Sequence, residues 1–297
     1  MTPLLDALHS GRVLLMDGAM GTALQRSGLK AGDNAAAWNR THPERVEAVH
    51  RAYVAAGADV LLTNTFLINL LHEPAEIAWQ TAFVRMRNAP VYCLAAVGPV
   101  AGEVTEREFG DWDRFFIPDR CLVDHTVCRH WPHGILLETC SSPRVRFAMH
   151  RLREGQVPLL LSLSYRREAG GQIRTASGHS PEWFARRARA YGAQALGVNC
   201  GVNIGMGESI EILRRYREET DVPLFARPNA GTPVRRAGTW VYPQSPEGMA
   251  ERLPELIEAG ASMVGGCCGT SPEHVAAFRK VVDSWNSRLD ESGRNAL

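Results

Sequence analysis

The sequence lacks a net charge of either sign, with 33 Lys and Arg residues against 32 Asp and Glu residues. A chain that binds nucleic acid or an anionic membrane through its overall field carries a clear basic excess, so we expect neither partner. It also lacks an apolar run near the roughly 18 residues of a transmembrane helix, and no signal-peptide pattern opens it. These absences together predict a cytoplasmic protein.

Cysteine is sparse, and its number is odd: seven in 297 residues. A chain this long does not need disulfides to hold a core, so we interpret these cysteines as free thiols or metal ligands. The composition, 45% hydrophobic and 22% charged, is typical of a soluble globular protein. The length is close to the roughly 250 residues of a single (β/α)8 barrel. We therefore expect one domain over residues 1–297.

Eight short apolar runs recur along the chain, each followed by a polar or glycine-bearing turn and a segment of helical period. Continuous apolar runs are typical of parallel strands that are buried on both faces. Eight such β-then-α units predict an α/β protein with a single (β/α)8 TIM barrel, and a doubly wound sheet is the alternative. The runs lie at residues 13–17, 59–65, 91–97, 134–139, 158–164, 195–200, 223–229 and 262–267.

Helix start signals follow several of these runs. Ser180 and Ser245 each precede a proline and a glutamate, which places a side-chain acceptor at the N-cap and proline at the first helical position. Thr41, with Glu44 three residues later, resembles a capping box. We therefore expect helices to begin at these three places.

Polar residues gather at the carboxyl ends of the apolar runs. In a (β/α)8 barrel these ends form one face, which carries the chemistry. We therefore expect the polar residues to share one site. They are Asp17, Asn64, Glu138, Asn199, Cys200, Asn229, Cys267 and Cys268.

Three of these residues are cysteines on neighbouring strands. Cys200 ends the sixth run, and Cys267 and Cys268 end the eighth, so their thiols can converge on one ion around a closed barrel. Zn²⁺ favours tetrahedral sulfur ligation, and three protein ligands leave a fourth position for water or substrate. Three thiolates suit the activation of a further sulfur better than that of water. Packing in the core is the alternative, because cysteine is among the most buried residues.

The Cys267–Cys268 pair raises a question of geometry. Neighbouring side chains on a regular strand point to opposite faces, so both thiols can meet one target only if the backbone leaves the strand. Gly265, Gly266 and Gly269 frame the pair. Since glycine tolerates positive φ, we expect these three residues to permit that departure.

Several short motifs are spread over the whole chain. They are D-G-A-M-G-T at 17–22, T-N-T-F at 63–66, G-P at 98–99, E-T at 138–139, G-V-N-C at 197–200, P-N-A-G at 228–231 and G-G-C-C-G-T at 265–270. Together they resemble the homocysteine S-methyltransferase family. This group of (β/α)8 barrels includes the betaine and S-methylmethionine enzymes and the homocysteine domain of cobalamin-dependent methionine synthase.

The resemblance implies a role for each polar residue at the strand ends. The zinc ligands fall on Cys200, Cys267 and Cys268, and Asp17 and Glu138 would hold the α-ammonium group of homocysteine. Backbone amides around Gly18, Gly21 and Thr22 would receive its carboxylate. The remaining candidates for substrate contact are Asn64, Asn199 and Asn229, of which Asn229 could also be a neutral fourth zinc ligand.

The implied reaction joins homocysteine to a methyl group from a small onium donor and yields methionine. S-methylmethionine is the first choice of donor and betaine the second, because 297 residues leave no room for separate folate or cobalamin domains. Alternatives are another thiol or selenol acceptor, a separate corrinoid protein as methyl source, and an inactive zinc-dependent thiol-binding module. The oligomeric state is not readable. Aromatic residues that might face the donor's charge are Trp38, Trp112, Trp240 and Tyr242.

The sequence departs from the family pattern in two connections. The T-N-T-F motif is usually followed by glycine and a longer helical connection, whereas here Leu67-Ile68-Asn69 follows Phe66. The segment 102–133 is irregular as well. Because βα connections shape the donor side of the pocket, these departures bear on the donor more than on zinc or homocysteine.

Overall fold

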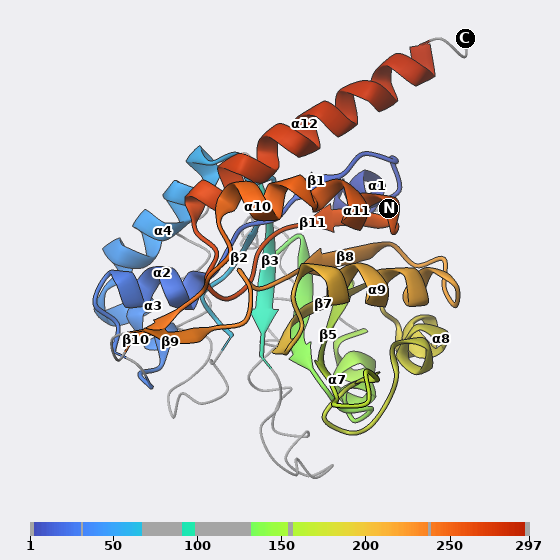
Figure 1. Ribbon diagram of the computed structural model, residues 1–297, viewed down its shortest axis with the longest axis horizontal. Helices are drawn as coiled ribbons and strands as arrows, with labels where there is room; N and C mark the ends of the chain where they lie inside the picture. The colour runs from blue at the N-terminus through green and yellow to red at the C-terminus, as the bar shows by residue number, and fades with distance from the viewer. Residues whose placement is uncertain are drawn as a thin grey trace, which may run out of the picture.

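A computed structural model of the protein describes residues 3–30, 32–66, 91–98, 132–153, 157–236 and 239–294. Eight parallel strands form a ring in the order β1-β11-β8-β7-β5-β4-β3-β2, and a parallel bridge between Met16 and Val60 joins its two ends (Figure 1). The (β/α)8 prediction is thus confirmed, and the doubly wound alternative is wrong. The strands are β1 (Leu14–Leu15), β2 (Val60–Leu62), β3 (Tyr92–Val97), β4 (Gly134–Cys140), β5 (Leu159–Arg167), β7 (Ala195–Val202), β8 (Leu224–Arg227) and β11 (Ala261–Val264).

Helices surround this ring. Within the described ranges, three short strands lie outside it: β6 (Ile173–Arg174) pairs with β5, and β9 (Val234–Arg236) pairs with β10 (Thr239–Val241) in an antiparallel hairpin after β8. The departure at 67–69 and all but the last two residues of the departure at 102–133, Trp112 included, lie outside the described residues. The helices are α1 (Pro3–Leu8), α2 (Met20–Arg26), the 3-10 turn η1 (Ala35–Ala37), α3 (Trp38–Thr41), α4 (Pro43–Ala55), α7 (Val145–Leu152), α8 (Pro181–Tyr191), α9 (Met206–Arg217), α10 (Pro246–Glu251), α11 (Leu253–Glu258) and α12 (Pro272–Arg294).

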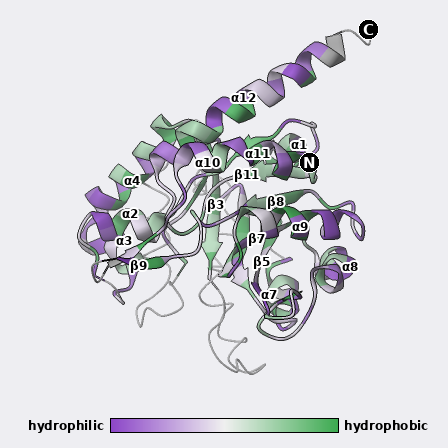
Figure 2. Cartoon of the chain, viewed as in Figure 1, coloured by the Kyte–Doolittle hydropathy of each residue, from purple (hydrophilic) through white to green (hydrophobic). Residues whose placement is uncertain are grey.

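The core has two parts because alternate residues of each strand point to opposite faces. In β2, Leu61 joins the cluster between strands and helices, whereas Val60 and Leu62 join the cluster inside the ring. Leu4 and Leu5 of α1 belong to this inner cluster, so α1 packs against the barrel interior. Figure 2 shows the apolar strands at the centre and the mixed polarity of the surrounding helices. A barrel filled in this way positions its strand ends rigidly.

Two of the three expected helix starts are confirmed. The Ser180 and Ser245 hydroxyls accept from the backbone N–H groups of Trp183 (3.4 Å) and Gly248 (3.1 Å). The capping box at Thr41 is wrong, because α4 begins at Pro43. Thr41 is the last residue of α3, and its hydroxyl donates to the Ala37 carbonyl at 3.2 Å. The hydroxyl that looked like an N-cap is therefore used by the preceding helix.

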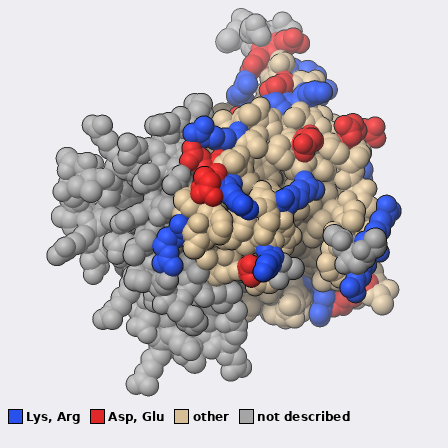
Figure 3. All heavy atoms as spheres, turned by 90° about the vertical axis from the view of Figure 1, so that its left-hand side faces the viewer, with Lys and Arg blue, Asp and Glu red and all other residues tan. Residues whose placement is uncertain are grey.

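The described residues give two observations on the helices and on the surface. Within the part of the chain that the structure describes, no helix is long and apolar enough to cross a membrane. On the face drawn in Figure 3, basic and acidic side chains of the described residues are interspersed. This mixture agrees with the near-neutral composition.

Candidate metal and substrate site

The three cysteines converge at the carboxyl end of the barrel. The Sγ atoms of Cys200, Cys267 and Cys268 all lie within 4.8 Å of one another, and 3.9 Å separates those of Cys200 and Cys268. Tetrahedral zinc with Zn–S bonds of about 2.3 Å places its sulfur ligands about 3.8 Å apart. Among the described residues, this is the one group of three or more possible ligands found so close together. The donor set and its spacing therefore fit zinc.

An extra residue in β7 places the first of these thiols. Val198 pairs with Leu163 and Gly201 with Tyr165, so β7 advances three residues while β5 advances two. Cys200 lies in this bulge with a φ of 53°, in the left-handed region that residues with a Cβ seldom adopt. Bulges of this kind re-aim side chains beside active sites. The Cys200 sulfur thereby turns toward the pair that follows β11.

The glycines around the cysteine pair act mainly by making room. Only Gly269 has positive φ, at 84°, so the expectation was wrong for Gly265 and Gly266. A Cβ on Gly265 would lie 2.7 Å from the Met16 Cβ, and one on Gly266 would lie 2.3 Å from the Thr270 hydroxyl oxygen. The loop after β11 therefore packs too closely against its neighbours for larger residues.

The thiols share their protons unevenly. Hydrogen bonds from the Cys267 and Cys268 thiols lower the pKa of Cys200, whereas the same contacts with Cys200 raise the pKa of Cys268. The contacts within the cluster thus favour the thiolate form of Cys200 over that of Cys268. Thiolate is the form that binds metals.

Two buried carboxylates lie beside the thiols with an arginine between them. Asp17, Glu138 and Arg227 are only 1%, 7% and 4% exposed. Nη2 of Arg227 lies 3.1 Å from Asp17 Oδ1, and its Nη1 donates to Glu138 Oε1. Arg227 was missed at the sequence level. The available signal was a charged residue within an apolar run, since a buried arginine requires partners.

Burial changes the protonation of both acids. It raises the pKa of Asp17 and of Glu138 to about 7, although the positive charge of Arg227 opposes the shift. When both are ionised, two carboxylates and one guanidinium leave one net negative charge. One further cation would neutralise this charge.

Asn199 connects the carboxylates to the thiols. Its Oδ1 accepts from the Thr139 backbone (3.1 Å) and the Ser162 hydroxyl (2.5 Å). Its Nδ2 lies 2.8 Å from Thr139 Oγ1, 3.4 Å from Glu138 Oε1 and 3.8 Å from Cys267 Sγ. This buried amide is thereby fixed, and it orients groups on both sides of the site.

The other two asparagines differ in what they contact. Asn229 Nδ2 lies 3.6 Å from Cys200 Sγ, and its buried Oδ1 has no hydrogen-bond partner among the described residues. An orphaned oxygen beside the thiols suits a cation. Asn64 donates to the Ala35 carbonyl (2.7 Å) and to Asn39 (3.1 Å), so its amide fastens η1 and α3 to the end of β2.

The segment expected to receive the substrate carboxylate lies against the cysteine loop. Gly18 precedes α2, and Gly21 and Thr22 lie in its first turn, whose N–H groups have no partner within the helix. The hydroxyl of Thr22 accepts from the Gly269 N–H at 3.2 Å. A Cβ on Gly18 would lie 2.8 Å from the Tyr53 ring, while one on Gly21 would meet open space. The carboxylate role of these amides stays a prediction.

The aromatic residues considered for the donor are dispersed. Tyr242 lies beside the cysteine loop, where burial and its contact with Cys268 raise the pKa of its phenol. Trp38 is buried and stacks on His42, with ring centroids 4.4 Å apart, and Trp240 is exposed on β10. Of these, Tyr242 is the one placed next to the thiols.

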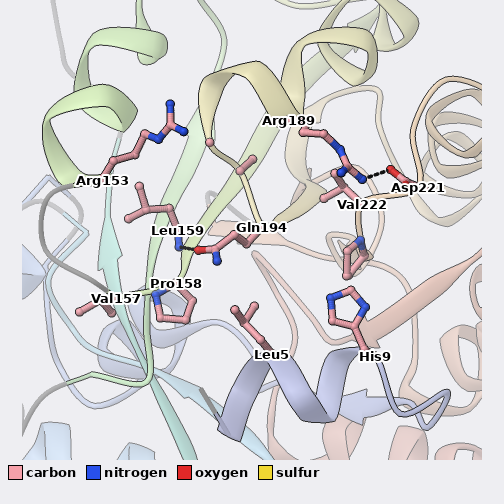
Figure 4. Close-up of a pocket in the computed structure, with 13 residues that line it drawn as sticks. Leu5, His9, Arg153, Val157, Pro158, Leu159, Arg189, Gln194, Asp221 and Val222 are labelled. Carbon is pink, nitrogen blue, oxygen red and sulfur yellow. Dashed lines mark hydrogen bonds and ion pairs between the residues drawn. The ribbon is translucent and has the colours of Figure 1, made fainter. Parts of the chain in front are cut away.

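A cavity lies at the opposite end of the barrel. It measures about 770 Å³ and is lined by Leu5 of α1, by His9 just after that helix and by residues near the amino ends of β5, β7 and β8 (Figure 4). Arg189 points to Asp221 at its edge, and Gln194 accepts from the Leu159 backbone. Because barrels of this class carry their chemistry at the carboxyl ends of the strands, we assign the site to the thiol end.

Comparison with known proteins defines the class. Residues 14–282 match the family described as homocysteine S-methyltransferase. Since this match covers most of the chain, the protein belongs to that family. The barrel that the motifs led us to expect is thus confirmed, whereas the roles of the three thiols and the two carboxylates stay predictions.

Individual relatives refine the comparison. The chain is 30% identical to the methionine synthases of Mycobacterium leprae (strain TN) and Mycobacterium tuberculosis (strain ATCC 25618 / H37Rv), over 96% and 95% of its own length. It spans only 25% of either relative. The apo and metallated crystal structures of the homocysteine methyltransferase MmuM from Escherichia coli superpose with TM-scores of 0.69 and 0.68. These cover 92% and 94% of this chain and 97% and 99% of theirs, at 22% and 21% identity, and show the shared fold.

Proposed function

We propose that this barrel is a zinc-dependent methyltransferase that moves a methyl group from a small onium donor to homocysteine and yields methionine. The observation that carries the proposal is the cluster of Cys200, Cys267 and Cys268, with three Sγ atoms within 4.8 Å beside buried carboxylates. The likeness to MmuM, one of whose structures is of a metallated form, supports the metal. We regard residues 1–297 as one homocysteine-binding domain that acts in the cytoplasm.

The three cysteines would hold zinc, which when bound keeps an acceptor thiol deprotonated at neutral pH. The chain's own residues bind and align the substrate. Glu138 accepts from the ammonium group, the first turn of α2 faces the carboxylate, and Asn199 holds Glu138 and Cys267 in register. Alignment of this kind lowers the activation barrier of methyl transfer, because the bound reactants have already lost their free translation and rotation.

The transfer itself needs little proton movement. The acceptor sulfur forms a bond to the methyl carbon while the bond from that carbon to the onium sulfur or nitrogen breaks. Since the leaving group departs neutral, no acid has to protonate it. This agrees with a site whose titratable groups face the acceptor.

For the donor, we propose S-methylmethionine first and betaine second. A second arrangement is favoured by the curated relatives, methionine synthases of which this chain matches a quarter. There a separate corrinoid protein would deliver the methyl group to the same acceptor site. Another thiol or selenol in place of homocysteine is the remaining alternative.

The test is a donor panel. Zinc-loaded protein is incubated with homocysteine and S-methylmethionine, betaine or a methylated corrinoid protein, and methionine is measured by mass spectrometry. Metal-free protein is the control. We expect methionine with one donor class in the zinc-loaded sample only. Homocysteine binding without product from any donor would point instead to a zinc-dependent thiol-binding module.

A further inference from the structure

A buried guanidinium already lies where the acceptor's ammonium group was expected. Arg227, at the end of β8 and only 4% exposed, contacts Asp17 and Glu138 together. Nη2 of the same group lies 3.4 Å from the Gly18 carbonyl. These are the two carboxylates that the resemblance to the family assigns to the ammonium group. The space between them is therefore taken by a side chain of the protein.

Both carboxylate oxygens of Asp17 accept hydrogen bonds from other residues of the barrel. Oδ2 accepts from the Leu62 backbone N–H at 2.8 Å, and Oδ1 accepts from Arg227 at 3.1 Å. The Asp17 backbone N–H donates to the Val60 carbonyl at 2.9 Å. Asp17 thus joins β1 to β2 and fixes Arg227.

Glu138 keeps one oxygen available. Its Oε1 accepts from Arg227 and lies 3.4 Å from Asn199 Nδ2, whereas Oε2 receives no hydrogen bond from the described residues. A second cation placed between both carboxylates would lie against the guanidinium. Like charges repel strongly in a buried site, because little water screens them. The open oxygen of Glu138 is the place left for an ammonium group.

We propose that Arg227 determines acceptor selectivity by filling the cation position between Asp17 and Glu138. The site then recognises its acceptor through sulfur and carboxylate, and offers the amino group one oxygen of Glu138. Its substrate class therefore includes mercaptocarboxylates that lack the amino group. This inference rests on the proposed function, in which a thiol acceptor binds zinc-loaded protein.

The direct test compares homocysteine with its desamino analogue, 4-mercaptobutanoate, by calorimetric titration of zinc-loaded protein. A site built around an amino group rejects an analogue without it by roughly 10⁴-fold. For this protein we expect homocysteine to bind no more than about tenfold tighter. A preference above roughly a hundredfold would overturn the proposal.

Two variants separate the charge of Arg227 from its bulk. Arg227→Met leaves the carboxylates without their cation, so we expect the preference for homocysteine to rise by about tenfold or more. Arg227→Lys keeps a cation there and should retain the wild-type ratio. An unchanged or smaller ratio in Arg227→Met, with circular dichroism showing a folded barrel, would count against the proposal.

The ratio of the wild-type affinities for homocysteine and 4-mercaptobutanoate tests the proposal even if Arg227→Met does not fold. Failure of the two ideas is also distinguishable. If neither thiol binds the zinc-loaded protein, the proposed function falls and this inference falls with it. If homocysteine binds and its analogue is strongly rejected, only the role given to Arg227 is refuted.

Discussion

The two ends of the barrel treat charge in opposite ways. At the amino end, a cavity is lined in part by an exposed ion pair, Arg189 and Asp221, whose side chains are 72% and 79% exposed. At the carboxyl end, Asp17, Glu138 and Arg227 are almost completely buried and paired. Buried charges lose hydration, so a fold retains them mainly where they confer specificity or chemistry. The comparison teaches that buried, paired charges locate this site better than the presence of a cavity does.

The largest effect on the carboxyl-end site is expected from the removal of one thiol. Cys267→Ala should lose stoichiometric zinc and lower turnover by at least about a thousandfold, because two thiolates cannot hold the metal that activates the acceptor. Cys93→Ala is the matched control, since Cys93 is buried on β3 and outside the cluster. Metal analysis and circular dichroism should show a zinc-free, folded barrel in the first variant alone. A fully active Cys267→Ala protein would refute the assignment of the site.

A smaller effect is expected from a substitution of the Glu138 carboxylate. Glu138→Gln keeps the shape but removes the charge from the one oxygen offered to the amino group, so homocysteine affinity should fall by up to about tenfold, the lower end of the range of a charge-assisted hydrogen bond. Zinc content should be unchanged, since Glu138 is not in the thiol cluster. Calorimetric titration and metal analysis on the same preparation check both statements. Unaltered affinity would remove Glu138 from substrate binding.

His50 offers a contrast with the paired charges of the site, because it is a buried polar group that lies outside the site. Both its ring nitrogens lack partners among the described residues, and burial lowers its pKa from 6.5 to about 4. Below pH 6.5 the unfolded chain takes up a proton that the folded protein excludes, so stability falls as the pH drops toward 4. At about pH 5 this loss is about 2 kcal/mol. His50→Leu should remove that part of the pH dependence in urea unfolding, and an identical slope in both proteins would contradict the assignment.

The smallest effect is expected at the amino end. Arg189→Ala breaks the exposed pair with Asp221 at the edge of the large cavity. Turnover and homocysteine affinity should stay within about twofold of wild type, as for most surface substitutions. A large loss of activity in steady-state kinetics would show that this end takes part in function, and the contrast between the two ends would fail.

Local patterns were enough to predict the barrel and its thiols. Each strand is a short apolar run, and each of the three cysteines closes such a run, so their common edge followed from the closed topology. Asp17 and Glu138 were found by the same rule. These features depend on residues close in sequence and on the fixed direction of parallel strands.

The missed features depend on pairing between distant parts of the chain. Arg227 meets partners 210 and 89 residues away, and nothing next to it in sequence indicates which charges it will contact. The bulge at Cys200 depends on how β7 aligns with β5. The capping box at Thr41 was wrong because two helices meet there, and the local pattern does not show which helix uses the hydroxyl.

The join between β1 and β2 has a practical consequence for studies of this site. Two carboxylates replace strand carbonyls there: Asp59 accepts from the Leu15 N–H and Asp17 from the Leu62 N–H, each at 2.8 Å. Replacing Asp17 therefore loosens the closure of the cylinder as well as altering the charges near the acceptor. Faster hydrogen–deuterium exchange at Leu62 would reveal that loosening, because local opening exposes the amides it releases. Any loss of activity in an Asp17 variant is interpretable only beside that exchange rate.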